Sequence, residues 1–485
     1  MRRGFGSRFG SFAALAATLA ILGTVAAGCG AASGAGGGSH DSAAGLVPGD
    51  AVAFITVSTD TGGTQLKNAE AVLNKFPAHT KLVAALEKSL ASGGTNVAQL
   101  QSSLGPELDV AILNVGGKPV PVGFTKPKDA AGFTATLQKA KSEQIDGWTV
   151  FAETQAALDA VTNRTSNLSD AQDYQDASKS LPGETLASAF AGKSAFALAG
   201  PLAGKASSQA GSAAGALNLS KLGWVAGAVT SHDNGIELEL HAHGTSAASL
   251  GSGSNPLTGE IPGGVLAAAA FSGSSSLSSL SDSALAQPGA ASALAQAQNV
   301  LGVSVPDLVQ AVNGPVILYV KAGAPVPEVT IVVKPADAQK AQQTVGTLLG
   351  KLTKGTTPTS TTVNGVTLQS VALGPVSIYY GTFDGQLVLT DSQTAIGELQ
   401  STSNRLADDD TYKAAAKASG LPDSSPAWLY VDLQDTIPAV ESLAALAGQQ
   451  VPATVGPNLQ SLKSFVAYGS TDGDTSTAVL FLQTN

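Results

Sequence analysis

The chain has 485 residues, of which 43% are hydrophobic and only 13% are charged. This length predicts two or three domains, and the apolar content is sufficient for a large core. Acidic residues outnumber basic ones by 36 to 26, which argues against nucleic acid as a partner and against polybasic docking on anionic lipid. Cys29 is the only cysteine, so no disulfide within the chain is possible.

The first 28 residues have the pattern of a secretory signal peptide. Arg2, Arg3 and Arg8 are followed by an uncharged, Ala-rich run over residues 12–28, which is short for a stable membrane span. The run ends in Ala-Ala-Gly-Cys at residues 26–29, which resembles the lipobox of bacterial lipoproteins. That resemblance implies cleavage between Gly28 and Cys29, a thioether-linked diacylglycerol on Cys29, and a further acyl chain such as palmitate on the new amino terminus. The alternatives are an uncleaved anchor or an ordinary signal peptide that is cleaved elsewhere.

Residues 29–45 are rich in Gly, Ala and Ser, and we expect them to be a flexible tether. Beyond them, hydrophobic periodicity and turn residues predict alternating strands and helices. In chain order these are a strand at 51–57, two helices that carry the periodic apolar residues of 66–76 and 82–90, strands at 108–113 and 120–124, a helix at 129–141, a strand at 148–152, helices at 154–161 and around Tyr174, a strand at 194–198, and a hairpin of 224–229 with 236–242.

The same order of motifs occurs twice. Val-Pro-Gly at 47–49, Gly-Pro at 105–106 and Lys-Pro at 126–127 recur as Ile-Pro-Gly at 261–263, Gly-Pro at 314–315 and Lys-Pro at 334–335. Asp-Gly at 146–147 and Leu-Pro at 181–182 recur at 384–385 and 421–422, after extra residues around 353–382. We therefore expect an α+β fold made by tandem duplication of a mainly antiparallel sheet covered by helices on one face. The first repeat spans residues 46–243, a linker spans 244–259, and the second repeat spans 260–485.

The best metal candidate is the set Glu237, Glu239, His241 and His243. Period-2 alternation places these four side chains on one face of a strand, where His-x-His can chelate a cation. A polar sheet face in water is the simpler interpretation, and no metal or other cofactor is expected.

Other groups have structural explanations that compete with functional ones. The run Asp408-Asp409-Asp410 could bind a cation, or it could charge the first turn of a helix. Trp148, Trp224 and Trp428 could stack on carbohydrate, or they could belong to the core. No nucleophile elbow, phosphate loop or zinc-protease motif stands in a usable context, so no catalytic residue is assigned.

Three stretches resemble the bacterial domain-of-unknown-function family 3352. They are Leu-Val-Pro-Gly-Asp-Ala-Val-Ala-Phe at 46–54, Leu-Asn-Lys-Phe-Pro at 73–77 and Leu-Gly-Pro-Glu-Leu at 104–108. The resemblance covers residues 46–485 and implies an extracytoplasmic envelope protein with no established reaction.

The sequence thus predicts a lipid-anchored protein on the extracytoplasmic face of the cell membrane, with an unknown ligand or envelope protein as its partner and no enzymatic activity. A lipid or glycolipid carrier is the first alternative, and an envelope hydrolase with an unrecognised site is the second.

Overall fold

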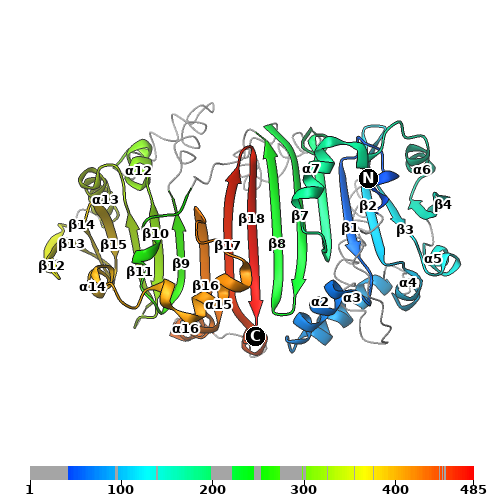
Figure 1. The fold of residues 1–485 in the computed structure, drawn as a ribbon. Coiled ribbons are helices and arrows are strands. Elements are labelled where there is room, and N and C mark those ends of the chain that lie inside the picture. The colour runs from blue at the N-terminus through cyan, green and yellow to red at the C-terminus, as the bar shows by residue number, and fades with distance from the viewer. Residues whose placement is uncertain are drawn as a thin grey trace, which may run out of the picture. The chain divides into compact units, whose positions relative to one another are not determined.

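The computed structural model describes residues 42–92, 97–137, 140–197, 221–244, 253–272, 302–324, 326–353, 356–374, 376–446 and 455–485, together with a few isolated positions between these ranges. The signal peptide, Cys29 and nearly all of the expected tether lie outside the described residues. The chain divides into two compact units. Unit 1 is Met1–Ala247 with Pro457–Ser461 and Thr484–Asn485, and unit 2 is Ala248–Gly456 with Leu462–Gln483. Figure 1 labels the elements of both units.

Unit 1 is built on an antiparallel sheet. Its central strand β1 pairs on one side with β2 and on the other with β6; β2 continues to β3, β5 and β4, and β6 continues to β7 and β8. The strands are β1 (Ala53–Ser58), β2 (Glu107–Val115), β3 (Lys118–Thr125), β4 (Lys141–Ile145), β5 (Trp148–Ala152), β6 (Ala187–Gly192), β7 (Leu222–His232) and β8 (Gly235–Gly244). The helices are η2 (Ala43–Gly45), α2 (Thr64–Asn74), α3 (His79–Ser92), α4 (Val97–Ser103), α5 (Ala130–Thr136), α6 (Gln155–Thr162), η3 (Leu168–Asp170) and α7 (Gln172–Ser180).

Helices cover both faces of this sheet, so the expectation of helices on one face is wrong. Leu158 of α6 and Ala177 of α7 pack on one face with Phe124 and Trp148, whereas Leu66 of α2 packs on the other with Leu186 and Val229. The cause is visible in β5, where all five residues are buried. A strand that is apolar on both sides must be covered on both sides.

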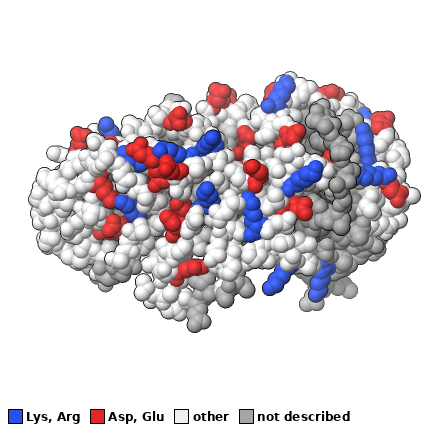
Figure 2. All heavy atoms as spheres, turned by 60° about the horizontal axis from the view of Figure 1, so that its bottom comes forward, with Lys and Arg blue, Asp and Glu red and all other residues white. Residues whose placement is uncertain are grey.

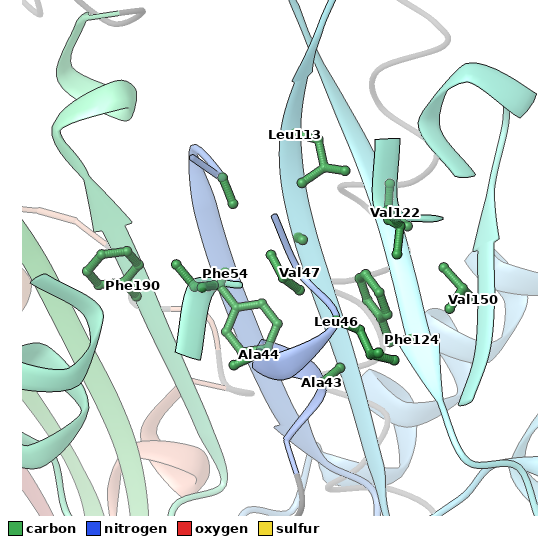
Figure 3. Close-up of a cluster of buried hydrophobic side chains, with 14 of the residues drawn as sticks. Ala43, Ala44, Leu46, Val47, Phe54, Leu113, Val122, Phe124, Val150 and Phe190 are labelled. Carbon is green, nitrogen blue, oxygen red and sulfur yellow. The ribbon is translucent and has the colours of Figure 1, made fainter. Parts of the chain in front are cut away.

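The first described turn belongs to the core. Ala43 and Ala44 of η2, with Val47 after it, are buried against Phe54 and Phe124 (Figure 3). The expectation of a flexible tether is therefore wrong at residues 43–45, because the small side chains of Ala43 and Ala44 pack in the core.

Unit 2 repeats the strand order of unit 1. Strand β9 pairs with both β10 and β16, β10 continues to β11, β15 and β14, and β16 continues to β17. The strands are β9 (Val265–Phe271), β10 (Val316–Lys321), β11 (Glu328–Val333), β12 (Thr359–Val363), β13 (Val366–Leu373), β14 (Val376–Phe383), β15 (Gln386–Thr390), β16 (Ala427–Asp432), β17 (Leu462–Asp472) and β18 (Thr475–Thr484). The helices are η5 (Thr258–Glu260), α12 (Val305–Val312), α13 (Ala338–Leu352), α14 (Thr394–Gln400), η6 (Leu406–Asp408), α15 (Asp410–Ser419), α16 (Leu433–Leu446) and α17 (Val455–Leu459).

The extra residues expected around 353–382 form strands. Strand β12 pairs with β13, and β13 pairs with β14, so β12 and β13 have no counterpart among the described strands of unit 1. Within the stretch 244–259 where a linker was expected, Asn255 and Leu257 are buried.

Two expected elements differ from the structure. The strand expected at 194–198 lies earlier, as β6, and Ser194 follows it in a helical turn. The helix expected at 129–141 stops at Thr136, and β4 begins at Lys141. In both cases pairing with a neighbouring strand overrides the local pattern.

Candidate functional site

Strand β2 contains two carboxyl side chains inside unit 1. Asp109 has no solvent exposure and Glu107 has only 6%. The two residues are separated by one position, so both point to the face of β2 that also carries Ala111 and Leu113. Leu108 and Val110 on the opposite face are buried as well. Both faces of the strand are therefore shielded from water at this point.

The first described residues, 42–44, lie over Asp109. The backbone amide of Ala43 donates a hydrogen bond to Asp109 Oδ2 at 2.8 Å, and Ser42 caps the same turn by accepting from the amide of Ala44. Thr56 stands opposite Asp109 in the β1–β2 register. Residues 42–44 therefore lie over Asp109 and help to keep it from water.

Aromatic rings border the pair. Tyr174 of α7 packs edge-on against Phe54 and Phe190, with ring centroids 5.9 and 5.3 Å apart. Its pKa is raised, first by burial, and the charges of Asp109 and Glu107 raise it further, while a hydrogen bond with Ser42 lowers it. Tyr174 therefore belongs to the same electrostatic cluster as the two carboxyls.

Burial raises the pKa of Asp109 well above its ordinary value, and the negative charge of Glu107 raises it further. The hydrogen bond from Ala43 and the Thr56 hydroxyl lower it. Burial and the neighbouring charge therefore both favour the protonated form of Asp109.

The metal candidate on β8 is not assembled. His241 is buried and its Nε2 lies 2.9 Å from Glu239 Oε1. The ring of His243 instead stacks on Trp224, with centroids 5.5 Å apart, and Glu237 faces His232 at 3.7 Å. In the described part of the chain, no group of three or more His, Cys, Asp or Glu side chains could hold a metal ion.

The simpler interpretation, a polar sheet face in water, is wrong at His241, which is buried, whereas Leu240 on the opposite face is 39% exposed. Burial raises the pKa of Glu237; the positive charge of His232 lowers it and Glu239 raises it.

The aspartate run has a structural role in unit 2. Asp409 is the N-cap of α15 and accepts hydrogen bonds from the amides of Thr411 and Tyr412. Asp410 lies in the first helical turn and pairs with Lys413 at 3.3 Å, where its charge is favourable against the helix dipole.

The three tryptophans are core residues. Trp148, Trp224 and Trp428 are each buried to at least 95%, so none presents a ring face for a sugar. Lys126 places its Nζ 4.7 Å from the Trp148 ring centroid.

Glu107 and Asp109 were not expected as site residues. A strand was expected at 108–113, and alternation alone would turn its acidic side chains to water. The available signal was the strand's composition, since Leu108, Val110, Ala111 and Leu113 leave no polar face for Asp109 to occupy.

The fold and the site together define a mixed α+β protein whose two units each contain an antiparallel sheet, with a buried carboxyl pair under the first described turn of unit 1. In the described part of the chain, none of the helices has the length and apolar character needed to cross a bilayer. On the face shown in Figure 2, acidic and basic side chains are interspersed.

Comparison with known families identifies the family of the chain. Residues 145–484 match the family described as "Protein of unknown function (DUF3352)", and the chain therefore belongs to that family. The match begins after the three stretches that suggested it, which lie within 46–108. No curated protein matches the chain. Among solved structures, crystal form IV of TP0453 is similar with a TM-score of 0.24 and 10% identity, over 46% of this chain and 91% of that one.

Proposed function

We propose that this chain is a lipid-anchored, extracytoplasmic protein that binds a ligand or an envelope partner without catalysing a reaction. The observation that carries the proposal is the position of the first folded turn. Ser42 follows Cys29 closely in the sequence, and Ala43 is already buried and bonded to Asp109. A lipid on Cys29 would thus be joined to the core of unit 1 by a short stretch of chain.

The non-enzymatic part of the proposal is supported by the roles of the polar clusters. Asp409 caps a helix, and Glu239 and His241 bond to each other. In the described residues these contacts use the side chains for folding and do not bring a nucleophile, a base and an oxyanion donor to one point.

We also propose that units 1 and 2 arose by tandem duplication. The shared strand order supports this, as do two isolated bridges at matching places, Pro48 with Asn167 and Pro262 with Arg405. One binding function could then have been kept in one unit and changed in the other.

The anchor is tested by expressing the full chain in a bacterium that processes lipoproteins. We expect the wild-type protein in the membrane fraction, with a diacylglycerol-modified Cys29 as its first residue by mass spectrometry. A Cys29→Ala variant should lose the modification, and a Ser39→Ala variant should keep it. An unmodified Cys29 in the wild-type protein would refute the anchor.

The binding role is tested on the same membranes. Crosslinking of the wild-type protein followed by mass spectrometry should recover a reproducible envelope partner, or native mass spectrometry should show an added mass that is lost on denaturation. If organic extraction identifies that mass as lipid, the carrier function is favoured. Turnover of an envelope substrate by the purified chain would overturn the non-enzymatic proposal.

A further inference from the structure

The carboxyl pair of unit 1, Glu107 and Asp109, is buried. Among the described residues no basic side chain lies within salt-bridge distance of Asp109, and its Oδ1 atom has no hydrogen-bond partner at normal geometry. An ionised carboxylate in such surroundings is strongly unfavourable unless it is neutralised. Binding a proton neutralises it without any further partner.

The surroundings of Asp109 are fixed by four elements. Glu107 lies on the same strand, Thr56 faces it from β1, Phe124 faces it from β3, and Tyr174 approaches from α7. The ionisable groups that act on Asp109 are thus one acid and one phenol, neither of which supplies positive charge near neutral pH. Lys126, directly after β3, directs its ammonium group over the Trp148 ring.

In unit 2 the residues at the equivalent positions are neutral. The β1–β2 pair Thr56 and Asp109 corresponds in register to the β9–β10 pair Ala270 and Ile317, and both of those residues are buried. The turn at η5 is held by Asn255, whose Oδ1 accepts from the amide of Leu257 at 2.8 Å. The Asn255 amide group also donates to the carbonyls of Phe271 and Val316. A neutral side chain is therefore sufficient to hold such a turn.

We propose that Glu107 and Asp109 form a proton-binding latch on the start of the folded chain. With one proton on the pair, residues 42–47 stay closed over Asp109. When the proton leaves to water and both carboxyls are ionised, the segment lifts and lets water reach them. The latch acts on the first folded residues and does not depend on a lipid at Cys29.

The direction of the pH effect follows from linkage. Because the folded-state pKa of Asp109 is raised, the closed form is fully favoured at low pH and loses free energy as pH rises through that pKa. If one proton is released per opening, the opening constant rises by up to about tenfold per pH unit between the ordinary pKa of an exposed aspartate and the raised pKa of the closed form, and it levels off above the latter.

The test is hydrogen exchange of the purified full chain, read by mass spectrometry across pH 5 to 9 and corrected for the intrinsic exchange rate. In wild-type protein we expect the protection of residues 42–48 to fall by about tenfold or more over this range. The internal control is the matching segment 257–263 of unit 2, whose protection should stay constant. Asp109→Asn imitates the protonated acid, since its Oδ1 still accepts from Ala43, and should hold residues 42–48 closed at every pH.

Two further variants keep the test decisive. Asp50→Asn makes the same chemical change at an exposed position of the same region and should leave the wild-type pH response intact. If Asp109→Asn does not fold, Glu107→Gln removes the neighbouring charge and keeps the Ala43 bond. Because this lowers the folded-state pKa of Asp109, the fall in protection of residues 42–48 should be smaller than in wild-type protein and should level off at a lower pH.

Two outcomes would overturn the latch. One is a pH-independent protection of residues 42–48 in wild-type protein. The other is restored protection at pH 9 on addition of Ca²⁺ or Na⁺ in wild-type but not in Asp109→Asn protein, which would identify a cation site in place of a proton site.

Discussion

The two units place a short helical turn at the same point of their sheets but bond its first amide differently. In unit 1 the amide of Ala43 meets the carboxyl of Asp109, which comes from a distant strand. In unit 2 the amide of Leu257 meets Asn255, only two residues before it. The first arrangement ties the turn to the sheet through an ionisable group, and the second ties it locally through a neutral one. The same fold can therefore make its first turn sensitive or insensitive to protons.

The aromatic clusters of the two units are alike in their packing. Tyr174 packs on Phe54 and Phe190, and the corresponding Tyr412 packs on Trp428 and Tyr430. Burial raises the pKa of Tyr412 to about 12, with a further contribution from Asp423. A helix-borne tyrosine on aromatic strand residues is thus common to both units, whereas the carboxyl pair belongs to unit 1.

The largest loss of free energy of unfolding should come from replacing equivalent core side chains of the two units by alanine. Phe124 and Val332 occupy equivalent places opposite Asp109 and Ile317, and both are fully buried. We expect Phe124→Ala to lower the free energy of unfolding of unit 1 by about 3–5 kcal/mol, and Val332→Ala to lower that of unit 2 by about 2 kcal/mol.

Urea titration with tryptophan fluorescence can separate the two. Trp148 and Trp224 report on unit 1, and Trp428 reports on unit 2. Phe124→Ala is therefore made in a protein that lacks Trp428, and Val332→Ala in one that lacks Trp148 and Trp224. Equal losses in both units would contradict the difference in buried volume.

Asn255→Asp should make the turn of unit 2 depend on an ionisable carboxyl, as the turn of unit 1 does. The new carboxylate loses both donors to Phe271 and Val316, so we expect a loss of about 2–3 kcal/mol at neutral pH. Because burial would raise the folded-state pKa of this aspartate, the loss should shrink as pH falls and grow as pH rises. The measurement is the urea midpoint of unit 2 at several pH values.

Asn255→Ala serves as the control for that variant. It removes the same hydrogen bonds without adding an ionisable group, so its loss should not change with pH beyond that of the wild-type protein. A pH slope equal to that of Asn255→Asp would show that charge is not responsible.

Exchanging helix caps should give the smallest effect. Asp409 caps α15, whereas the matching N-cap of α7 is Ala171, which makes no side-chain cap. We expect Asp409→Ala to cost about 1 kcal/mol and Ala171→Asp to gain up to about 1 kcal/mol. Thermal denaturation of both variants checks the opposite signs, and a loss for Ala171→Asp would show that the two helix starts differ in geometry.

The sequence predicted the elements whose signals are local. The run Trp148–Ala152 is strand β5 with the expected bounds. The turn at Asp233-Asn234-Gly235 joins β7 to β8 as expected. Strand β6 was placed too late, because Ala, Ser and Gly carry little strand preference and its position is set by pairing with β1 and β7.

The candidate site could not be predicted in the same way. Asp109 becomes buried only when Ala43, which is 66 positions earlier, folds over it. No pattern within a window of neighbouring residues contains that contact. The four polar residues of β8 gave a clear alternation, but the stacking of His243 on Trp224 and the bond of His241 to Glu239 decided where their side chains lie.

The pairing of β1 with both β2 and β6 has a consequence for the order of folding. Strand β2 is near in sequence, but β6 follows β1 by more than a hundred residues, and closing so long a loop costs conformational entropy before any contact repays it. A chain that is synthesised from its amino terminus therefore holds one edge of its first strand open until Ala187–Gly192 have emerged. The same delay recurs for β9, which waits for β16. Each unit is thus completed by its later strands, and in the interval the open edge is the place where a chaperone would be most useful or a wrong strand most harmful.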